Sequence, residues 1–211
     1  MTETYIGLLR HGQTDWNIDF RLQGITDTNL NPTGIAQANA VGELLQASDW
    51  DVFLTSPLTR AKDTAAIVSE RTGLVGATIE PLLLERSFGE AEGLTHAEWQ
   101  EAYPNHAPVP GGESLDELAD RAWALLDTLS ERYQGRRVLA VSHGALIRKL
   151  LNLASGGELP REGERLGNAS LNVIAHNENG WRVHKYLLPT YDGLPLGFQL
   201  HRFEEFYQAL G

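Results

Sequence analysis

The chain has 211 residues, 42% of them apolar, which is enough to bury the core of one large domain. It contains no cysteine, so disulfides, thiolate metal ligands and a cysteine nucleophile are excluded. A net charge of −11 disfavours nucleic acid and anionic membranes as partners, and no run approaches the roughly 20 apolar residues that span a bilayer. We therefore expect a cytoplasmic protein that binds neither nucleic acid nor membrane.

The first predicted elements are a strand and a helix. Residues 5–9 form a short apolar run of strand length. Asn31 followed by Pro32 is typical of a helix N-terminus, with asparagine as the cap and proline in the first turn. The apolar face expected for this helix consists of Ile35, Ala38, Val41 and Leu45.

A second strand is predicted at 52–55, and a second helix follows it. Ser56 is the expected N-cap, Pro57 the first helical residue and Gly73 the residue beyond the C-terminus. These signals place the helix directly after the strand, as in a β-α unit.

The second half of the chain continues the alternation. Ser114 and Glu117 form a capping box. The helix that they begin has an apolar face formed by Leu118, Ala122, Leu125, Leu126 and Leu129. A strand at 138–141 is followed by a tight turn and another helix, and strands at 172–175 and 181–186 are expected to pair as a hairpin.

Strands that alternate with long helices predict an α/β fold, a three-layer α/β/α sandwich with a mostly parallel central sheet. We expect one domain over 1–211, with 95–113 as a small cap or loop insertion and 191–211 as a C-terminal tail. Ligands of such sheets bind at the carboxyl ends of the strands. Three predicted strands end there in polar residues, namely Arg10 with His11, the segment 56–60, and Ser142 with His143.

Arg60 lies in the first turn of its predicted helix, where the positive end of the helix dipole disfavours a cation. One interpretation is a solvated arginine whose aliphatic stem covers apolar surface. The other is an anion bound jointly by Arg60 and the free backbone N–H groups of that turn.

His11 and His143 are each followed by a glycine, Gly12 and Gly144. A single histidine at a strand end is more often a hydrogen-bonded structural residue than a catalyst, but glycine lets a ligand approach the backbone, so two such pairs favour a shared site. A metal site is the main alternative. It would set Arg10 beside the cation, and the chain has no HxH or HExxH pattern. Because an anion fits these neighbours better, we expect no metal and no other cofactor.

Five motifs occur in one order along the chain: LRHGQTDWN, RLQG, SPLTRAKDTA, LLERSFGEAEG and VSHGALIR. Together they resemble the histidine phosphatase superfamily, and more narrowly its phosphoglycerate-mutase-like branch. The resemblance extends from Tyr5 to about Ala175 and implies a phosphoglycerate-mutase-like version of the α/β fold.

The resemblance also implies roles for individual residues. The histidine of the RHG motif, His11, becomes transiently phosphorylated, and the glutamate of the LxExxFG motif, Glu85, is the general acid and base. The groups that hold the phosphate fall on Arg10, Arg21, Arg60 and His143. The remaining expected substrate contacts are Asn17, Gln23, Gly24 and Gly144.

The chemistry of a phosphate monoester agrees with these roles. Arginines and a histidine offer fixed donors to equatorial oxygens whose negative charge must be tolerated during transfer. A neutral imidazole attacks through one nitrogen while an acceptor fixes the other, and cationic neighbours favour the neutral form. A protonated Glu85 would donate to the leaving alkoxide and then activate water against phosphorylated His11. The arginines supply the positive charge that Mg²⁺ gives other phosphoryl-transfer enzymes.

Mutases of this family usually carry serine or threonine where this chain has Gln23, and they have a longer insertion that excludes water. The segment between Glu85 and His143 is short, so we predict a metal-independent phosphatase acting on small-molecule phosphate monoesters. A cofactor-dependent phosphoglycerate mutase is the alternative. A catalytically silent module that binds phosphorylated ligands is a third reading, which predicts damage to motif residues that are all intact here.

Sugar phosphates, phosphoglycerate derivatives and α-ribazole phosphate stay open as substrates. Trp99, His106 and Glu113 are candidate contacts at the rim of the site, with core packing for Trp99 and a solvated loop for His106 as alternatives. A glutamate at the rim would favour substrates with hydroxyls over those with a second phosphate.

Two further segments have predicted structural roles. Asn168 and Ser170 are expected to brace the edge of the sheet near the site. The aromatic spacing in 191–211 predicts a short amphipathic helix, packed on the domain or on a second subunit, so a homodimer is a candidate assembly.

Overall fold

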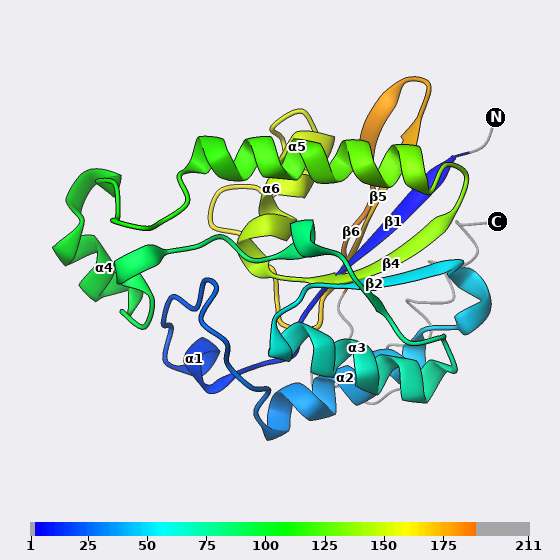
Figure 1. Cartoon of the computed structure of the whole chain (residues 1–211), viewed down its shortest axis with the longest axis horizontal. Coiled ribbons are helices and arrows are strands. Elements are labelled where there is room, and N and C mark those ends of the chain that lie inside the picture. The colour runs from blue at the N-terminus through cyan, green and yellow to red at the C-terminus, as the bar shows by residue number, and fades with distance from the viewer. Residues whose placement is uncertain (1–2, 189–211) are drawn as a thin grey trace.

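The computed structural model of the protein describes residues 3–188, and within that range it leaves the side chains of residues 106, 187 and 188 undescribed. The tail predicted at 191–211 lies outside the described residues. A six-stranded sheet, in the order β3-β2-β4-β1-β5-β6, forms the centre (Figure 1). Its strands are β1 Thr4–Arg10, β2 Val52–Thr55, β3 Thr78–Ile79, β4 Arg137–Ser142, β5 Leu171–Asn177 and β6 Gly180–Leu188.

The first four strands of the chain are parallel, and the last two form an antiparallel hairpin at one edge. This arrangement confirms the predicted mostly parallel sheet and the predicted hairpin. In the register of the sheet, Arg10 pairs with Ser142 and Thr55 pairs with Val141. The carboxyl ends of β1, β2 and β4 therefore meet at one edge, as the sequence predicts.

Helices cover both faces of the sheet, which confirms the three-layer fold (Figure 1). One face carries α2 Pro32–Leu44 and α3 Thr59–Thr72, and the other carries α5 Leu115–Arg132 and α6 Gly144–Ala154. Two short helices, α1 Asp15–Ile18 and α4 His96–Ala102, lie beyond the carboxyl ends of the strands. Short 3₁₀ turns occupy Ala47–Asp49, Pro81–Leu83, Gly89–Ala91 and Pro104–His106.

The core consists of two apolar clusters, one on each face of the sheet. Along β1, Ile6 and Leu8 pack into the cluster under α5 and α6, while Leu9 packs into the cluster under α2 and α3. This alternation follows from the period of two along a strand. Because both faces are buried, the strands read as continuous apolar runs and hold their carboxyl ends rigidly in place.

The start of α3 differs from the prediction. Ser56 is not the N-cap and Pro57 is not the first helical residue, because the helix begins at Thr59 with Leu58 as its cap. Leu58 is buried in an extended conformation, with φ −74° and ψ 142°, so the chain enters the core before it turns into the helix. The Ser56 hydroxyl instead lies at the sheet edge, 2.7 Å from Nε2 of His143. Arg60 still lies in the first turn, as predicted.

The apolar face of α2 is also shifted from the prediction. Ile35 is 45% exposed, whereas Ala38, Val41 and Leu45 are buried as expected. Gly34 takes the inward position, because a Cβ there would lie 2.1 Å from the Gln13 carbonyl oxygen, and this close approach turns Ile35 outward. Asn31 caps the helix as predicted, accepting from the Gly34 N–H at 2.8 Å. In residues 3–188, no helix combines the length and apolar character that a membrane span requires.

Candidate active site

The polar residues that end three parallel strands meet at the edge of the sheet. His11 follows β1 and His143 follows β4, and the centroids of their rings are 5.2 Å apart. Ser56, which follows β2, places its Oγ 2.7 Å from Nε2 of His143. The convergence predicted from the strand ends is therefore present, and it sets two histidines side by side in the protein interior.

His11 is held in the form that a nucleophile needs. Its side chain is 3% exposed, and Nδ1 lies 2.6 Å from the carbonyl oxygen of Gly12. Since a carbonyl only accepts, Nδ1 carries the hydrogen and Nε2 keeps its lone pair. Burial, followed by the charges of Arg10 and Arg60, lowers the pKa of His11 well below its usual 6.5. The neutral form is thus the one present at physiological pH.

Two arginines each keep a buried donor that is unsatisfied. Arg60, 1% exposed, donates to the carbonyl oxygens of Thr26 at 2.9 Å and Gly24 at 2.7 Å. Arg10 donates to the carbonyl oxygen of Leu166, and burial lowers its pKa to about 10, so it stays charged at neutral pH. The buried Nε atoms of both arginines have no partner within residues 3–188. A buried donor without a partner is costly, and an anion would satisfy both.

His143 supplies a third unsatisfied donor. Ser56 Oγ accepts from the Leu58 N–H at 3.3 Å, and we assign its hydroxyl hydrogen to the contact with Nε2 of His143. Nδ1 then carries a hydrogen, and it is buried without a partner in the described part of the chain. Burial and the nearby Arg60 charge lower the pKa of His143 well below 6.5. Neutral His143 can therefore donate to an anion through Nδ1.

Glu85 lies at the N-terminus of α6, which begins directly after His143. Its Oε2 accepts from the Ala145 N–H at 3.0 Å, and its Oε1 accepts from the N–H groups of Leu146 at 3.1 Å and Arg86 at 2.9 Å. The first turn of the helix and its dipole thus orient the carboxylate. Among residues 3–188, Oε2 accepts a single hydrogen bond, so it retains the capacity to hold a proton.

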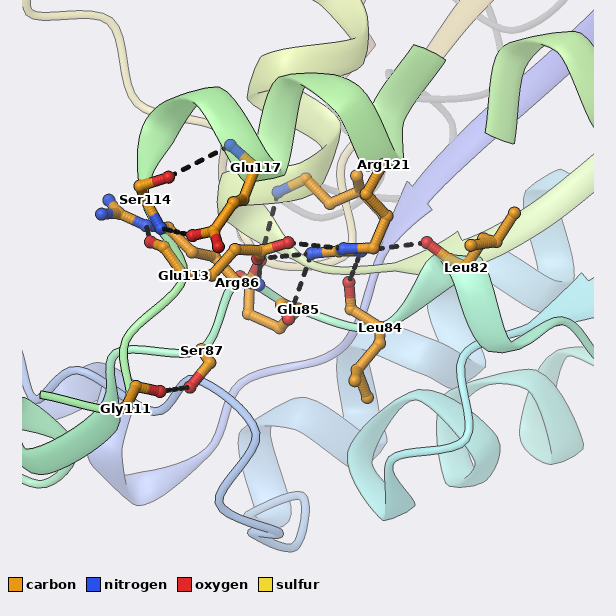
Figure 2. A network of polar contacts seen from close by, with 11 residues as sticks. Leu82, Leu84, Glu85, Arg86, Ser87, Gly111, Glu113, Ser114, Glu117 and Arg121 are labelled. Carbon is orange, nitrogen blue, oxygen red and sulfur yellow. Dashed lines mark hydrogen bonds and ion pairs between the residues drawn. The ribbon is translucent and has the colours of Figure 1, made fainter. Parts of the chain in front are cut away.

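Arg121 fixes the backbone on which Glu85 is carried (Figure 2). Its guanidinium donates to the carbonyl oxygens of Leu82 at 3.1 Å, Leu84 at 2.7 Å and Glu85 at 3.4 Å. The same group forms a two-pronged ion pair with Glu113, with both N···O distances 2.7 Å. The Glu113 carboxylate is therefore engaged by this contact, and Glu113 lines a small cavity together with Glu85.

Asn17 and Asn168 join the helix α1 to the nucleophile. Asn17 Oδ1 accepts from the Thr14 N–H at 3.1 Å and from Asn168 Nδ2 at 3.0 Å. Asn168 Nδ2 also lies 3.2 Å from the carbonyl oxygen of His11, so it braces this edge as predicted. With its oxygen engaged, Asn17 presents its amide N–H groups as the donors that remain for a ligand.

Arg21 and Gln23 differ from the buried residues. The Arg21 side chain is 39% exposed, pairs with Asp19 at 3.5 Å and donates to the Gly93 carbonyl oxygen at 2.7 Å. Gln23 is buried and accepts a hydrogen bond from the Thr28 hydroxyl at 2.8 Å. Arg21 thus lies at the mouth of the site, while Gln23 is engaged within its own loop.

A cavity of about 1130 Å³ opens at this edge, and we call it the main cavity. The predicted site residues that line it are Arg10, Asn17, Arg21 and Gly144. A Cβ at Gly144 would lie 3.4 Å from Arg10 Nε, so the glycine lets this donor approach. At Gly12 the close neighbour is protein backbone rather than a ligand, since a Cβ there would lie 2.5 Å from the Gly34 carbonyl oxygen.

Glu92 has a structural role that the sequence reasoning missed. Its carboxylate accepts from the N–H groups of Ile25 at 3.0 Å, Thr26 at 2.8 Å and Phe88 at 3.1 Å. These contacts fix the loop whose carbonyl oxygens hold Arg60. The EAEG part of the fourth motif was the available signal, because a glutamate between loop residues is suited to collecting backbone N–H groups.

The other predicted residues lie away from the reacting groups. Trp99 packs edge-on against Phe88 and His96, with ring centroids 6.4 and 5.4 Å apart, and it does not line the main cavity. Gly24 contributes its carbonyl oxygen to Arg60. The His106 side chain lies outside the described part of the protein. Across residues 3–188, no three His, Asp or Glu side chains group in a way that could hold a metal ion.

Comparison with known proteins shows the family to which the chain belongs. A model of the histidine phosphatase superfamily (branch 1) matches residues 6–188. The chain is 41% identical over 183 residues to a Bacillus subtilis protein named uncharacterized phosphatase PhoE, covering 87% of this chain and 94% of that protein. It is 35% identical over 200 residues to a metal-independent phosphoserine phosphatase of Arabidopsis thaliana, covering 87% and 81%.

Two further similarities extend the comparison. The chain is 35% identical over 196 residues to a Salmonella choleraesuis protein named probable phosphoglycerate mutase GpmB, covering 87% of this chain and 90% of that protein. The solved structure of a mycobacterial glucosyl-3-phosphoglycerate phosphatase superposes with a TM-score of 0.75 at 32% identity, covering 88% and 99%.

Proposed function

Because the chain belongs to the histidine phosphatase superfamily, we propose that it is a metal-independent phosphatase that hydrolyses small phosphate monoesters through a phosphohistidine at His11. One observation carries this proposal. A neutral histidine with a free Nε2 lies among three buried donors, Nε of Arg10, Nε of Arg60 and Nδ1 of His143, that lack protein partners within residues 3–188.

In the first step, Nε2 of His11 attacks the phosphorus and the P–O bond to the leaving alcohol breaks. Glu85 donates a proton to the departing oxygen, so that an alcohol rather than an alkoxide leaves. The positive charge that His11 acquires is stabilised by the transferred phosphoryl group. The donors of Arg10, Arg60 and His143 satisfy the equatorial oxygens as charge redistributes on them.

In the second step, the Glu85 carboxylate takes a proton from a water molecule whose oxygen attacks the phosphorus. The N–P bond breaks, inorganic phosphate leaves and His11 returns to its neutral form. Nδ1 keeps its hydrogen throughout and donates it in a hydrogen bond to the Gly12 carbonyl oxygen, which keeps the ring oriented. The arginines supply the positive charge for both steps, so the cycle needs no metal.

Hydrolysis is favoured over the mutase alternative. The relatives and the solved structure reported above include three named phosphatases and one named phosphoglycerate mutase. Gln23 stands where mutases of the family usually have serine or threonine, and it supports the same choice. A mutase must keep water from the phosphohistidine until the sugar acid returns, whereas a phosphatase admits water.

The proposal also includes a cytoplasmic location and a homodimer. A chain without cysteine needs no oxidising compartment for its stability. The apolar positions predicted in 191–211 would supply the subunit contact. Light scattering of the full chain and of a chain ending at residue 190 tests the assembly, since a dimer built on the tail would be lost in the second.

The test is phosphate release in EDTA from a panel of phosphorylated metabolites. We expect turnover by the wild type, loss below detection for His11→Ala, and a loss of about 10²–10⁴-fold for Glu85→Gln. His176→Ala, which removes a histidine at the far end of β5, is the matched control and should keep activity. With 3-phosphoglycerate and 2,3-bisphosphoglycerate, isomerisation without net release would contradict hydrolysis. Absence of turnover on every ester would favour the binding module.

A further inference from the structure

Arg60 is held at its two ends by different parts of the chain. At the backbone end, the Thr64 hydroxyl donates to the Arg60 carbonyl oxygen at 2.7 Å and accepts from the Gly12 N–H at 3.0 Å. The carbonyl oxygen of Gly12 in turn accepts from Nδ1 of His11. A fully buried hydroxyl therefore fixes the backbone of Arg60 relative to the nucleophile, independently of what holds the guanidinium group.

The guanidinium end of Arg60 is held by backbone groups of a loop. Its Nη1 donates to the carbonyl oxygen of Thr26 and its Nη2 donates to that of Gly24. Within residues 3–188, no carboxylate forms an ion pair with Arg60. Carbonyl dipoles orient a cation without cancelling its charge, so the charge stays available to a phosphate. The position of the loop at 24–26 therefore decides where the charge of Arg60 lies.

The carboxylate of Glu92 binds this loop from the side opposite to Arg60. Its Oε1 accepts from the Ile25 N–H at 3.0 Å, and its Oε2 accepts from the Thr26 N–H at 2.8 Å and from the Thr26 hydroxyl. A Cβ at Gly24 would lie 2.0 Å from Oε1, so the glycine lets the carboxylate reach the loop. Thr26 is thus bound by Glu92 through its N–H and by Arg60 through its carbonyl oxygen.

Glu92 is itself fixed by the turn on which it lies. Its Oε1 also accepts from the Phe88 N–H at 3.1 Å, across the 3₁₀ turn Gly89–Ala91. The next residue, Gly93, donates from its N–H to the carbonyl oxygen of Leu22 at 2.8 Å, which joins the turn to the start of the loop. Hydrogen bonds to a charged acceptor are about twice as strong as neutral ones. The carboxylate is therefore a firm anchor for the loop.

A second carboxylate, Asp27, acts on the other end of Arg60. It accepts from the Thr59 N–H at 2.7 Å and from the Thr59 hydroxyl at 2.6 Å. This contact ties the loop to the backbone next to Arg60, which Thr64 already fixes. Because Asp27 is exposed, water competes for these hydrogen bonds and their net contribution is small. Glu92, by contrast, binds the residue whose carbonyl oxygen receives the guanidinium group.

We propose that Glu92 is a positioning residue for catalysis, which sets the place of the Arg60 guanidinium group relative to His11. This inference rests on the proposed phosphatase function and adds a residue to the machinery of that site. It goes beyond support of the loop, because a displaced loop would leave Arg60 buried and charged but wrongly directed. A displacement of about 1 Å is enough to lower a rate about 10²-fold.

A double-mutant cycle with Arg60 tests the proposal. Glu92→Gln keeps the size of the side chain but turns an amide N–H₂ group toward backbone N–H donors, so the loop must shift. We expect kcat/KM to fall about 10–10²-fold, with an unchanged circular dichroism spectrum. In the Arg60→Met background the same substitution should lower kcat/KM less than about threefold, since no guanidinium group remains to be positioned. Glu90→Gln makes the same charge change at an exposed residue of the same turn and should leave kcat/KM unchanged.

Two further measurements support the cycle. Thr26→Val removes the hydroxyl that donates to Glu92 but keeps the backbone contacts, so kcat/KM should fall a few-fold, and this loss should also vanish in Arg60→Met. If Glu92→Gln fails to fold, Thr26→Val carries the test. Orthovanadate mimics the transition state of phosphoryl transfer, and calorimetry of its binding needs no turnover. It should bind Glu92→Gln at least about tenfold more weakly than the wild type.

The outcomes separate this proposal from the proposed function. Unchanged kcat/KM in Glu92→Gln, equal losses in the two backgrounds, or unchanged orthovanadate binding would each overturn the positioning role and leave Glu92 a part of the loop's stability alone. None of these results touches the phosphohistidine mechanism. That mechanism would fail if His11→Ala kept the hydrolysis, whereas orthovanadate binding by Glu92→Gln would still report on Glu92.

Discussion

Two arginines assigned to the same phosphate lie in opposite surroundings. Arg60 is 1% exposed and is held by two backbone carbonyl oxygens of a loop that Glu92 fixes. The Arg21 side chain is 39% exposed and already paired with Asp19. The resemblance implies the same role for both, but their different burial predicts different contributions to catalysis.

This difference separates two parts of the site: the buried end around Arg60, and the mouth of the cavity around Arg21. At the buried end, backbone carbonyls orient charges before substrate arrives, so no reorganisation is needed during transfer. At the mouth, Arg21 must exchange Asp19 and water for the phosphate, and solvent screens the gain. We infer that the buried end determines the rate and that the mouth tunes binding.

The largest effect is expected at Arg60. Arg60→Met removes a preoriented charge from the buried end and should lower kcat/KM about 10²–10³-fold, as does loss of an oxyanion donor in other enzymes. Steady-state kinetics on the best ester measures it, with circular dichroism to confirm that the variant is folded. A loss below tenfold in a folded variant would show that Arg60 only supports the loop.

An intermediate effect is expected at Arg121, a positioning residue. Arg121→Met frees the backbone at Leu84 and Glu85, so kcat should fall about tenfold with little change in KM. Glu113→Gln keeps the backbone contacts of Arg121 and should lower kcat less than Arg121→Met does. The distinguishing readout is the pH profile of kcat, which should shift in Arg121→Met because Glu85 is displaced. A fall in stability with normal kcat would reduce Arg121 to a structural role.

The buried histidines should make the protein sensitive to acid. The pKa values of His11 and His143 are well below 6.5 in the folded protein, chiefly because of burial, and return to about 6.5 on unfolding. The unfolded chain therefore binds more protons below pH 6.5, and stability falls as pH drops through that range while it is unaffected above it. Each histidine contributes a slope of about 1.4 kcal/mol per pH unit.

Urea unfolding at pH 7.5, 6.5 and 5.5 measures this slope. His143→Gln should reduce it, whatever its effect on stability at pH 7.5. His96→Gln, which changes an exposed histidine at the mouth, is the control and should leave the slope as in the wild type. Identical slopes for wild type and His143→Gln would mean that His143 is already protonated in the folded protein.

The smallest effect is expected at Arg21. Arg21→Met should raise KM less than about fivefold and leave kcat nearly unchanged, because an exposed, already paired arginine contributes at most about 1 kcal/mol. The effect should shrink further when the ionic strength is raised from 0.05 to 0.5 M, which screens exposed charges. A loss equal to that of Arg60→Met would contradict the division between the two ends.

The sequence predicted the buried end of the site well, because the residues that carry the chemistry there follow directly after the strands that form the fold. Apolar runs locate the parallel strands, and polar residues such as His11 and His143 directly after them must meet at one edge. Local errors arose where tertiary contacts override helix signals. Ser56 and Pro57 look like a helix start, but burial of Leu58 delays the helix to Thr59.

The surroundings of the site were less accessible from sequence, because they depend on contacts between distant segments. Arg121 of α5 reaches the carbonyl oxygens of Leu82 and Leu84, and Arg148 of α6 reaches the carbonyl oxygen of Glu164. One signal was present. Arg121 lies between Leu118 and Leu125 on the buried stripe of its helix, where a charge needs a partner. The groups that Arg121 contacts could be identified only from the structure.

The most direct test of the central claim is to trap the phosphorylated enzyme. The wild type is mixed with excess substrate, quenched in base within milliseconds, and digested for mass spectrometry with phosphate mapped to single residues. The account predicts a base-stable, acid-labile phosphate on the peptide that contains His11, absent in His11→Ala and increased in Glu85→Gln if water activation is slowed more than transfer. Phosphate release that proceeds with no phosphate on His11 would contradict it.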